Sequence, residues 1–149
     1  KYKTIRPIIL LIFIIYILIL IKIIIFKYSL SLLWDPNRQA FGVNLIPFNS
    51  IISMYKHMGF FNLNFIANIL SFFPLGFLLP IVFWKAKGLH CLLGVFATSL
   101  IFEVVQLITN FGSFDVDDII LNLMGGIIGF LIFKAFTFSV NKCKILIVQ

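Results

Sequence analysis

Charged residues are scarce in this sequence, and acidic residues are the scarcest. Asp, Glu, Lys and Arg make up 11% of the 149 residues, whereas hydrophobic residues make up 62% and the mean hydropathy is +1.14. Soluble domains are typically about 25% charged and about 45–50% apolar, so a soluble globular domain is excluded. The apolar runs are long and continuous rather than alternating, which predicts membrane-spanning helices instead of a β-barrel.

The sequence also lacks the usual signatures of catalysis and of metal binding. Cys91 and Cys143 have no zinc spacing and form no disulfide framework, and His57 and His90 stand alone. There is no Ser/His/acid arrangement and no glycine-rich phosphate loop. Nucleophilic catalysis is therefore unsupported, and no metal or cofactor is expected. The net charge of +7 does not indicate nucleic acid binding, because the basic residues are spread along the chain and gather at span ends.

At about 20 residues per span, the chain has room for four helices. We predict one all-α integral membrane domain over residues 1–149, a four-helix bundle with spans at about 7–26, 64–84, 89–109 and 116–138. The first span, rich in Ile and Leu, is expected to face lipid. The connection at 28–63 is long for a compact membrane protein, and long loops are often functional. Its segment 48–61 is weakly amphipathic and is a candidate for lying along the membrane interface.

The basic residues divide unevenly between the two sides of such a bundle. Eight fall on the side of the termini (Lys1, Lys3, Arg6, Lys85, Lys87, Lys134, Lys142 and Lys144) and three on the other (Lys27, Arg38 and Lys56). The positive-inside rule then predicts a multi-pass protein of the cell membrane with both termini in the cytoplasm. The 28–63 connection would be extracytoplasmic.

Polar side chains follow one face of three predicted spans at intervals of three or four residues. They are Asn64, Asn68 and Ser71; then Ser99, Glu103, Gln106 and Asn110; then Asp115, Asp118 and Asn122, followed on the same face by Gly125 and Gly129. An unpaired charge in hydrocarbon costs about 2.5–3.5 kcal/mol on insertion scales, so acidic residues within spans are candidates for function. A solvated loop with helix caps would explain Asp115 and Asp117, but it explains Glu103 and Gln106 poorly, because apolar residues flank them on both sides.

We therefore predict one ligand-binding site near the outer leaflet, with Glu103 and Asp118 as candidate catalytic groups. Its residues are Arg38, Asn68, Glu103, Gln106, Asp115, Asp118 and Asn122. Buried carboxylates require protonation, a cation or a basic partner, and a guanidinium fits a carboxylate bidentately, which favours Arg38 as that partner. A divalent cation held by Asp115, Asp117, Asp118 and Glu103 is a weaker alternative. Gly125 and Gly129 form a GxxxG pair, for which close helix packing is preferred, although an oligomer contact is also open.

Four blocks, in order, resemble the VanZ-like family of small bacterial membrane proteins. They are N-L-I-P-F (44–48), N-I-L-S-F-F-P-L-G-F-L-L-P (68–80), E-V-V-Q (103–106) and F-D-V-D-D-I-I-L-N-L-M-G-G-I-I-G (114–129). The resemblance implies that the polar signature of the family falls on residues of the predicted site: Asn68, Glu103, Gln106, Asp115, Asp118 and Asn122. It also implies a Gram-positive cell-envelope protein, since the family's namesake is associated with low-level teicoplanin resistance. Many members carry an Arg where this chain has Gly112, so an ion pair of the family is either missing here or supplied by Arg38.

Three functions remain open. The first is resistance to a teicoplanin-type glycopeptide, or binding of a lipid-linked or lipophilic molecule at the outer leaflet. The partners expected for this function are membrane lipid and a lipid-linked cell-wall precursor or a lipoglycopeptide. The second is an enzyme acting on a lipid-linked head group through Glu103 and Asp118. The third is a small ion-coupled transporter, which four spans and the lack of an inverted repeat disfavour.

Overall fold

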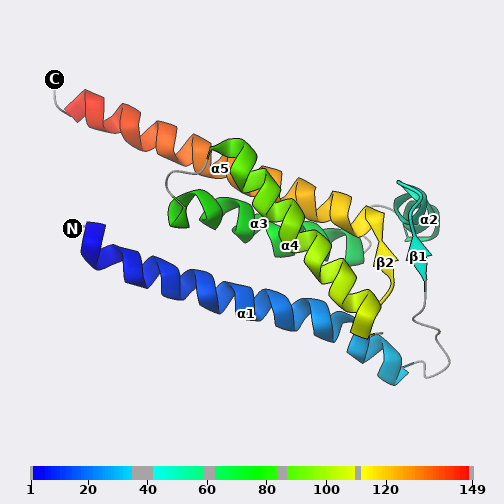
Figure 1. Ribbon diagram of the computed structural model, residues 1–149. Helices are drawn as coiled ribbons and strands as arrows, with labels where there is room; N and C mark the ends of the chain where they lie inside the picture. The colour runs from blue at the N-terminus through cyan, green and yellow to red at the C-terminus, as the bar shows by residue number, and fades with distance from the viewer. Residues whose placement is uncertain (1, 35–41, 59–62, 84–86, 110–111, 148–149) are drawn as a thin grey trace.

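The computed structural model describes residues 2–34, 42–58, 63–83, 87–109 and 112–147 (Figure 1). Its helices are α1 (Tyr2–Trp34), α2 (Asn49–Met58), α3 (Leu63–Val82), α4 (Gly88–Thr109) and α5 (Val116–Ile147), and its strands are β1 (Val43–Asn44) and β2 (Phe114–Asp115). Side chains are described at 6–24, 42–53, 55–56, 64–83, 87–109 and 112–140. Arg38, predicted to pair with the buried carboxylates, lies outside these residues.

Four of the helices are long and apolar enough to cross a membrane, as predicted. The spanning segments are Arg6–Ile24, Asn64–Val82, Gly88–Thr109 and Val116–Val140. Two helices are longer than predicted: α1 continues to Trp34 and α5 to Ile147, where a short tail was expected after 138. The prediction ended these helices where charged residues return. However, a helix continues beyond a membrane when no Gly or Pro interrupts it, and none occurs in 8–34 or 130–147.

The contact between α3 and α5 is the closest in the bundle because glycines line it. A Cβ built on Gly125 would overlap the backbone carbonyl of Ile69, and one built on Gly129 would overlap that of Phe73. Small residues allow two backbones to approach in this way. The packing interpretation of the GxxxG pair is therefore the one observed. Because α3 already covers this face, a second copy of the chain would have to displace α3 to use the same glycines.

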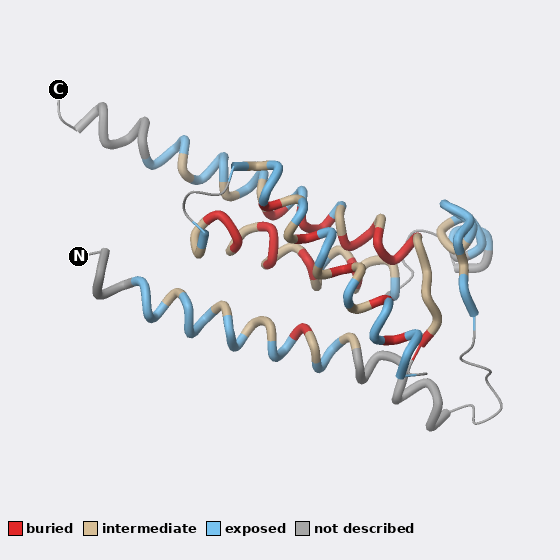
Figure 2. Tube along the Cα trace, in the orientation of Figure 1, coloured by how far each residue is buried: buried red, intermediate tan, exposed pale blue. Residues whose placement is uncertain are grey.

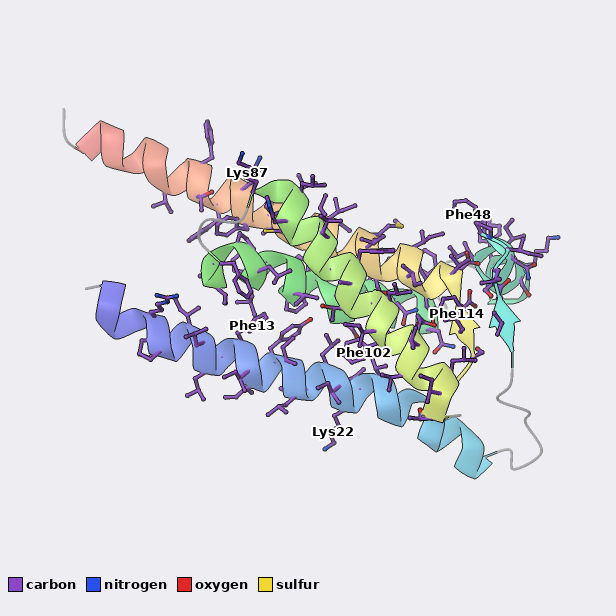
Figure 3. The ribbon with its side chains drawn as sticks, viewed as in Figure 1. Phe13, Lys22, Phe48, Lys87, Phe102 and Phe114 are labelled. Carbon is purple, nitrogen blue, oxygen red and sulfur yellow. The ribbon has the colours of Figure 1, made fainter. Side chains whose placement is uncertain are left out.

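Helix α1 lies along one side of the bundle and is largely exposed, as expected for a lipid-facing helix (Figure 2). One stripe nevertheless packs inward: Leu20 is buried, Phe13 points toward the bundle and Lys22 points away (Figure 3). The Tyr16 hydroxyl donates a hydrogen bond of 2.7 Å to the carbonyl of Ser71 in α3. That carbonyl is next to the one that Pro74 deprives of its helical donor. Helix α1 thus contributes a polar contact that the sequence did not indicate.

The end of the bundle at which α5 begins carries the remaining elements, and we call it the α2 end. Here β1 and β2 form a two-residue parallel pair in which Val43 is opposite Phe114 and Asn44 is opposite Asp115. Helix α2 lies beside this pair (Figure 1). The amphipathic segment thus contains a helix, Asn49–Met58, within the long connection, and its place along the membrane interface stays a prediction. The strand pair was not predicted, because two-residue strands leave no periodicity.

Candidate functional site

Polar side chains of three spans meet inside the bundle and form what we call the polar column. Its members are Asn68 of α3, Ser99, Glu103 and Gln106 of α4, Asp115 at the end of β2, and Asp118 and Asn122 of α5. All but Asp115, which is half-buried, are at least nine-tenths buried. Asp115 and Asn122 are seven positions apart in the sequence, which corresponds to about 10 Å along a helix. The buried members of the predicted stripes thus face one another, whereas Asn64 is exposed and Asn110 lies outside the described residues.

At the α2 end of the column, α4 is joined to the start of α5. The Glu103 carboxylate accepts a hydrogen bond of 2.9 Å from the backbone N–H of Asp115. The Asp115 carboxylate accepts one of 2.9 Å from the backbone N–H of Asp117 and so caps α5. Its other bonds come from Asn44 Nδ2 at 2.9 Å and from the Ser50 hydroxyl at 2.5 Å. Asp115 therefore connects α5 to β1 and α2.

Deeper in the bundle, the remaining column residues bond across helices. Asn68 Nδ2 donates to Asp118 Oδ1 at 2.5 Å, which joins α3 to α5. Asn122 Nδ2 donates to the Ser99 hydroxyl at 2.9 Å, which joins α5 to α4. Buried polar groups in an apolar medium are costly unless they are hydrogen-bonded, so these pairs position the three helices relative to one another.

Two amide oxygens in the column have no hydrogen-bond partner among the described residues. They are Gln106 Oε1 and Asn122 Oδ1, and each residue is only 4% exposed. Gln106 uses its nitrogen on the backbone carbonyl of Ile24 in α1, at 3.5 Å. A buried acceptor without a donor is unusual in native structures and points to a bound water or ligand.

The polar column ends in an apolar floor. One helical turn beyond Ser99 and Asn122, the same faces of α4 and α5 meet at Val95 and Gly126. Val95 is fully buried, and a Cβ on Gly126 would overlap its side chain. Phe72, Leu75 and Cys91 continue this core. The polar residues therefore extend from the α2 end only part of the way through the bundle.

Asp117 has a role that the sequence did not reveal, since it was predicted only as a cap or a weak cation ligand. It is 1% exposed, and its carboxylate accepts backbone N–H bonds from Phe48 at 2.5 Å, Ser50 at 2.8 Å and Ile51 at 3.1 Å. The anion thus sits at the N-terminus of α2, where backbone N–H groups and the helix dipole favour it. The recognisable signal is Pro47 in N-L-I-P-F, because Pro is common at the second position of a tight turn.

The turn before α2 presents apolar side chains outward. Ile46 O accepts a bond of 3.3 Å from Asn49 N, and Phe48 has a φ of 66°, as the third position of a type II turn requires. The exposed apolar residues at this end, which we call the apolar patch, are Leu45, Ile46, Phe48, Ile52 and Tyr55. Phe48 lies beside α2 at the end of the bundle (Figure 3).

The carboxylates do not converge in the way that a metal site requires. Within the described residues, no three His, Cys, Asp or Glu side chains lie close enough to hold a metal ion. Asp117 is directed to α2 and Asp115 to the strand pair, while Asp118 binds Asn68. The hypothesis of a divalent cation held by these residues and Glu103 therefore gains no support. Gly112, which stands where an Arg was expected from the resemblance, is buried.

Comparison with known proteins matches the sequence to one family. The model of the VanZ/LLP1 family matches residues 13–138. The curated "Protein VanZ" of Enterococcus faecium is 29% identical over 130 residues, which cover 87% of this chain and 76% of that protein. No solved structure matches.

Proposed function

We propose, because this chain belongs to the VanZ/LLP1 family, that it binds a lipid-linked or lipophilic molecule of the cell envelope in the polar column and thereby confers teicoplanin-type glycopeptide resistance. The carrying observation is the pair of buried oxygens without partners, Gln106 Oε1 and Asn122 Oδ1, in a column of otherwise bonded polar groups. Each open acceptor lowers stability unless a water or a ligand donates to it, so the column has two positions that a bound molecule can satisfy.

The α2 end faces the outside in this proposal. The eight-to-three distribution of basic residues supports that orientation, and exposed Lys87 lies at the opposite end of the bundle (Figure 3). The apolar patch would then lie at the outer leaflet, beside the start of the column. A molecule with both a polar group and an acyl chain could place the polar group in the column and keep the chain in lipid.

The apolar floor separates this proposal from ion-coupled transport. A transporter opens its site to each side in turn, whereas in this structure Val95 and Gly126 close the α4/α5 contact below Asn122. Binding from one side requires no such path. The enzyme alternative keeps Glu103 and Asp118 as its acid and base, but both carboxylates already accept hydrogen bonds, Glu103 from Asp115 N and Asp118 from Asn68 Nδ2.

The test compares wild type with Glu103→Gln in cells that contain equal amounts of each protein. A glutamine can still accept the Asp115 N–H bond but removes the negative charge from the column. Because we propose that this charge acts in binding, we expect normal insertion and accumulation with loss of teicoplanin resistance. Thr109→Val is the matched control, because the exposed Thr109 hydroxyl bonds only within α4, to the Val105 carbonyl. Full resistance in the Glu103→Gln strain, or no difference in resistance between wild type and an empty vector, would reject the proposal.

A further inference from the structure

We propose that the ligand group entering the polar column presents N–H or O–H donors, as a sugar hydroxyl or an ammonium does, and not phosphate oxygens. This inference rests on the proposed function, since it names the chemistry of the group that the column receives. It follows from which atoms of the column lack partners.

Gln106 fixes the polarity of the first position. Its amide faces the Ile24 carbonyl, which can only accept, so the amide nitrogen must point there. The opposite amide orientation would bring two oxygens together. The atom that remains without a partner is therefore an acceptor, Oε1, on a side chain that is 4% exposed.

Asn122 provides the second position, deeper in the bundle. With its nitrogen on the Ser99 hydroxyl, its Oδ1 is likewise buried without a partner. Ser99 and Gln106 are seven residues apart on α4, so the two open oxygens are separated by about 10 Å along the helix. Because the Ser99 hydroxyl can donate as well as accept, Gln106 alone fixes the preference for a donor, and Asn122 adds a second acceptor in the orientation seen here.

The groups between these two oxygens reinforce the preference. The Glu103 and Asp118 carboxylates are acceptors as well, and they bond to Asp115 N and to Asn68 Nδ2. A phosphate would bring acceptor oxygens against these acceptors. Two acceptors that face each other without a proton between them repel strongly at short range in an apolar medium. A hydroxyl or ammonium group would instead complete the missing hydrogen bonds.

The experiment measures binding of three probes with the same short chain to the purified protein. Hexyl glucoside, hexylammonium and hexyl phosphate are titrated below their micelle concentrations into protein held in an amine-oxide detergent, which has no donor of its own. Calorimetry and the midpoint of thermal unfolding report binding. We expect the glucoside, the ammonium or both to bind and to raise the midpoint, and the phosphate to bind at least tenfold more weakly.

Two variants connect the binding to the open oxygens. Gln106→Met keeps the length of the side chain but removes the acceptor, and Asn122→Leu removes the deeper one. One neutral hydrogen bond corresponds to a factor of about 3 to 10 in affinity, so each variant should bind the preferred probe weaker by about that factor. Thr109→Val is again the control and should bind as wild type does.

Each outcome decides the inference. Binding of the glucoside alone identifies hydroxyl donors, and binding of hexylammonium alone identifies an amine. Phosphate binding as tight as either probe, or equal binding by wild type and both variants, overturns the inference. If none of the three probes binds, the inference is also overturned, and water is then the donor to Gln106 Oε1 and Asn122 Oδ1. Probe binding without any resistance phenotype would instead refute the proposed function and leave the donor preference standing.

Discussion

Replacing Asp117 tests whether α2 is held by one buried carboxylate. In Asp117→Ala, the N–H groups of Phe48, Ser50 and Ile51 lose their acceptor together. A hydrogen bond to a charged group contributes about 1.5–3 kcal/mol, but the three bonds share one carboxylate and are not additive. Phe48 is more than half exposed, so water can replace part of what is lost. We expect α2 to be destabilised locally by about 2–4 kcal/mol.

Hydrogen exchange of the protein in lipid nanodiscs measures this change. A loss of about 2–4 kcal/mol corresponds to about 30- to 700-fold faster exchange at the three amides, up to the limit of an unprotected chain. Amides of α3, such as that of Leu75, should not change. In Asp117→Asn, the exchange rates should lie between those of wild type and Asp117→Ala. Its single amide oxygen can replace the carboxylate oxygen that accepts from Phe48 or the one that accepts from Ser50 and Ile51, but not both. Ser53→Ala, on the exposed part of α2, is the control. Unchanged exchange at Ser50 and Ile51 in Asp117→Ala would refute the capping role.

Three further predictions concern topology, packing and the membrane. In a background without Cys91 and Cys143, Ser113→Cys should react with a membrane-impermeant thiol reagent on intact cells. Reaction only after permeabilisation would show that the bundle has the opposite orientation in the membrane. Gly129→Ala should destabilise the bundle by about 1–3 kcal/mol, because the added methyl meets the α3 backbone, and an unchanged thermal midpoint would contradict this. In a background without the native tryptophans, Phe48→Trp should be quenched by lipids brominated on their chains, whereas no quenching would place the apolar patch in water.

The helices and the inward faces could be predicted from the sequence because both produce periodic patterns. Hydrophobic length gave the four spans, and spacings of three and four residues placed Glu103 with Gln106 and Asp118 with Asn122 on common faces. Because the predicted spans are so apolar, each polar residue within them stands out against its neighbours. The same periodicity explains why Gly125 and Gly129 were expected to permit close packing.

The α2 end was harder to predict because its structure depends on contacts between distant residues. Asp117 and Ser50 are 67 positions apart, and their bond follows no local pattern. The β1–β2 pair is only two residues long on each side. Tyr16 looked like one more apolar position of α1, because its partner is a backbone carbonyl that every residue type provides. Local periodicity cannot indicate such partners.

The first turn of α5 links the column to the surface. Within four residues of chain, Asp115 holds β1 and α2, Asp117 caps α2, and Asp118 binds α3, while the Asp115 backbone N–H holds Glu103 of α4. Displacing α2 would therefore disturb Asp115, whose backbone N–H orients the Glu103 carboxylate. A molecule that pressed on the apolar patch from the lipid side would act on this same turn. The four acidic residues of this region thus have two kinds of role. Asp115 and Asp117 hold β1 and α2 at the α2 end, and Glu103 and Asp118 line the polar column.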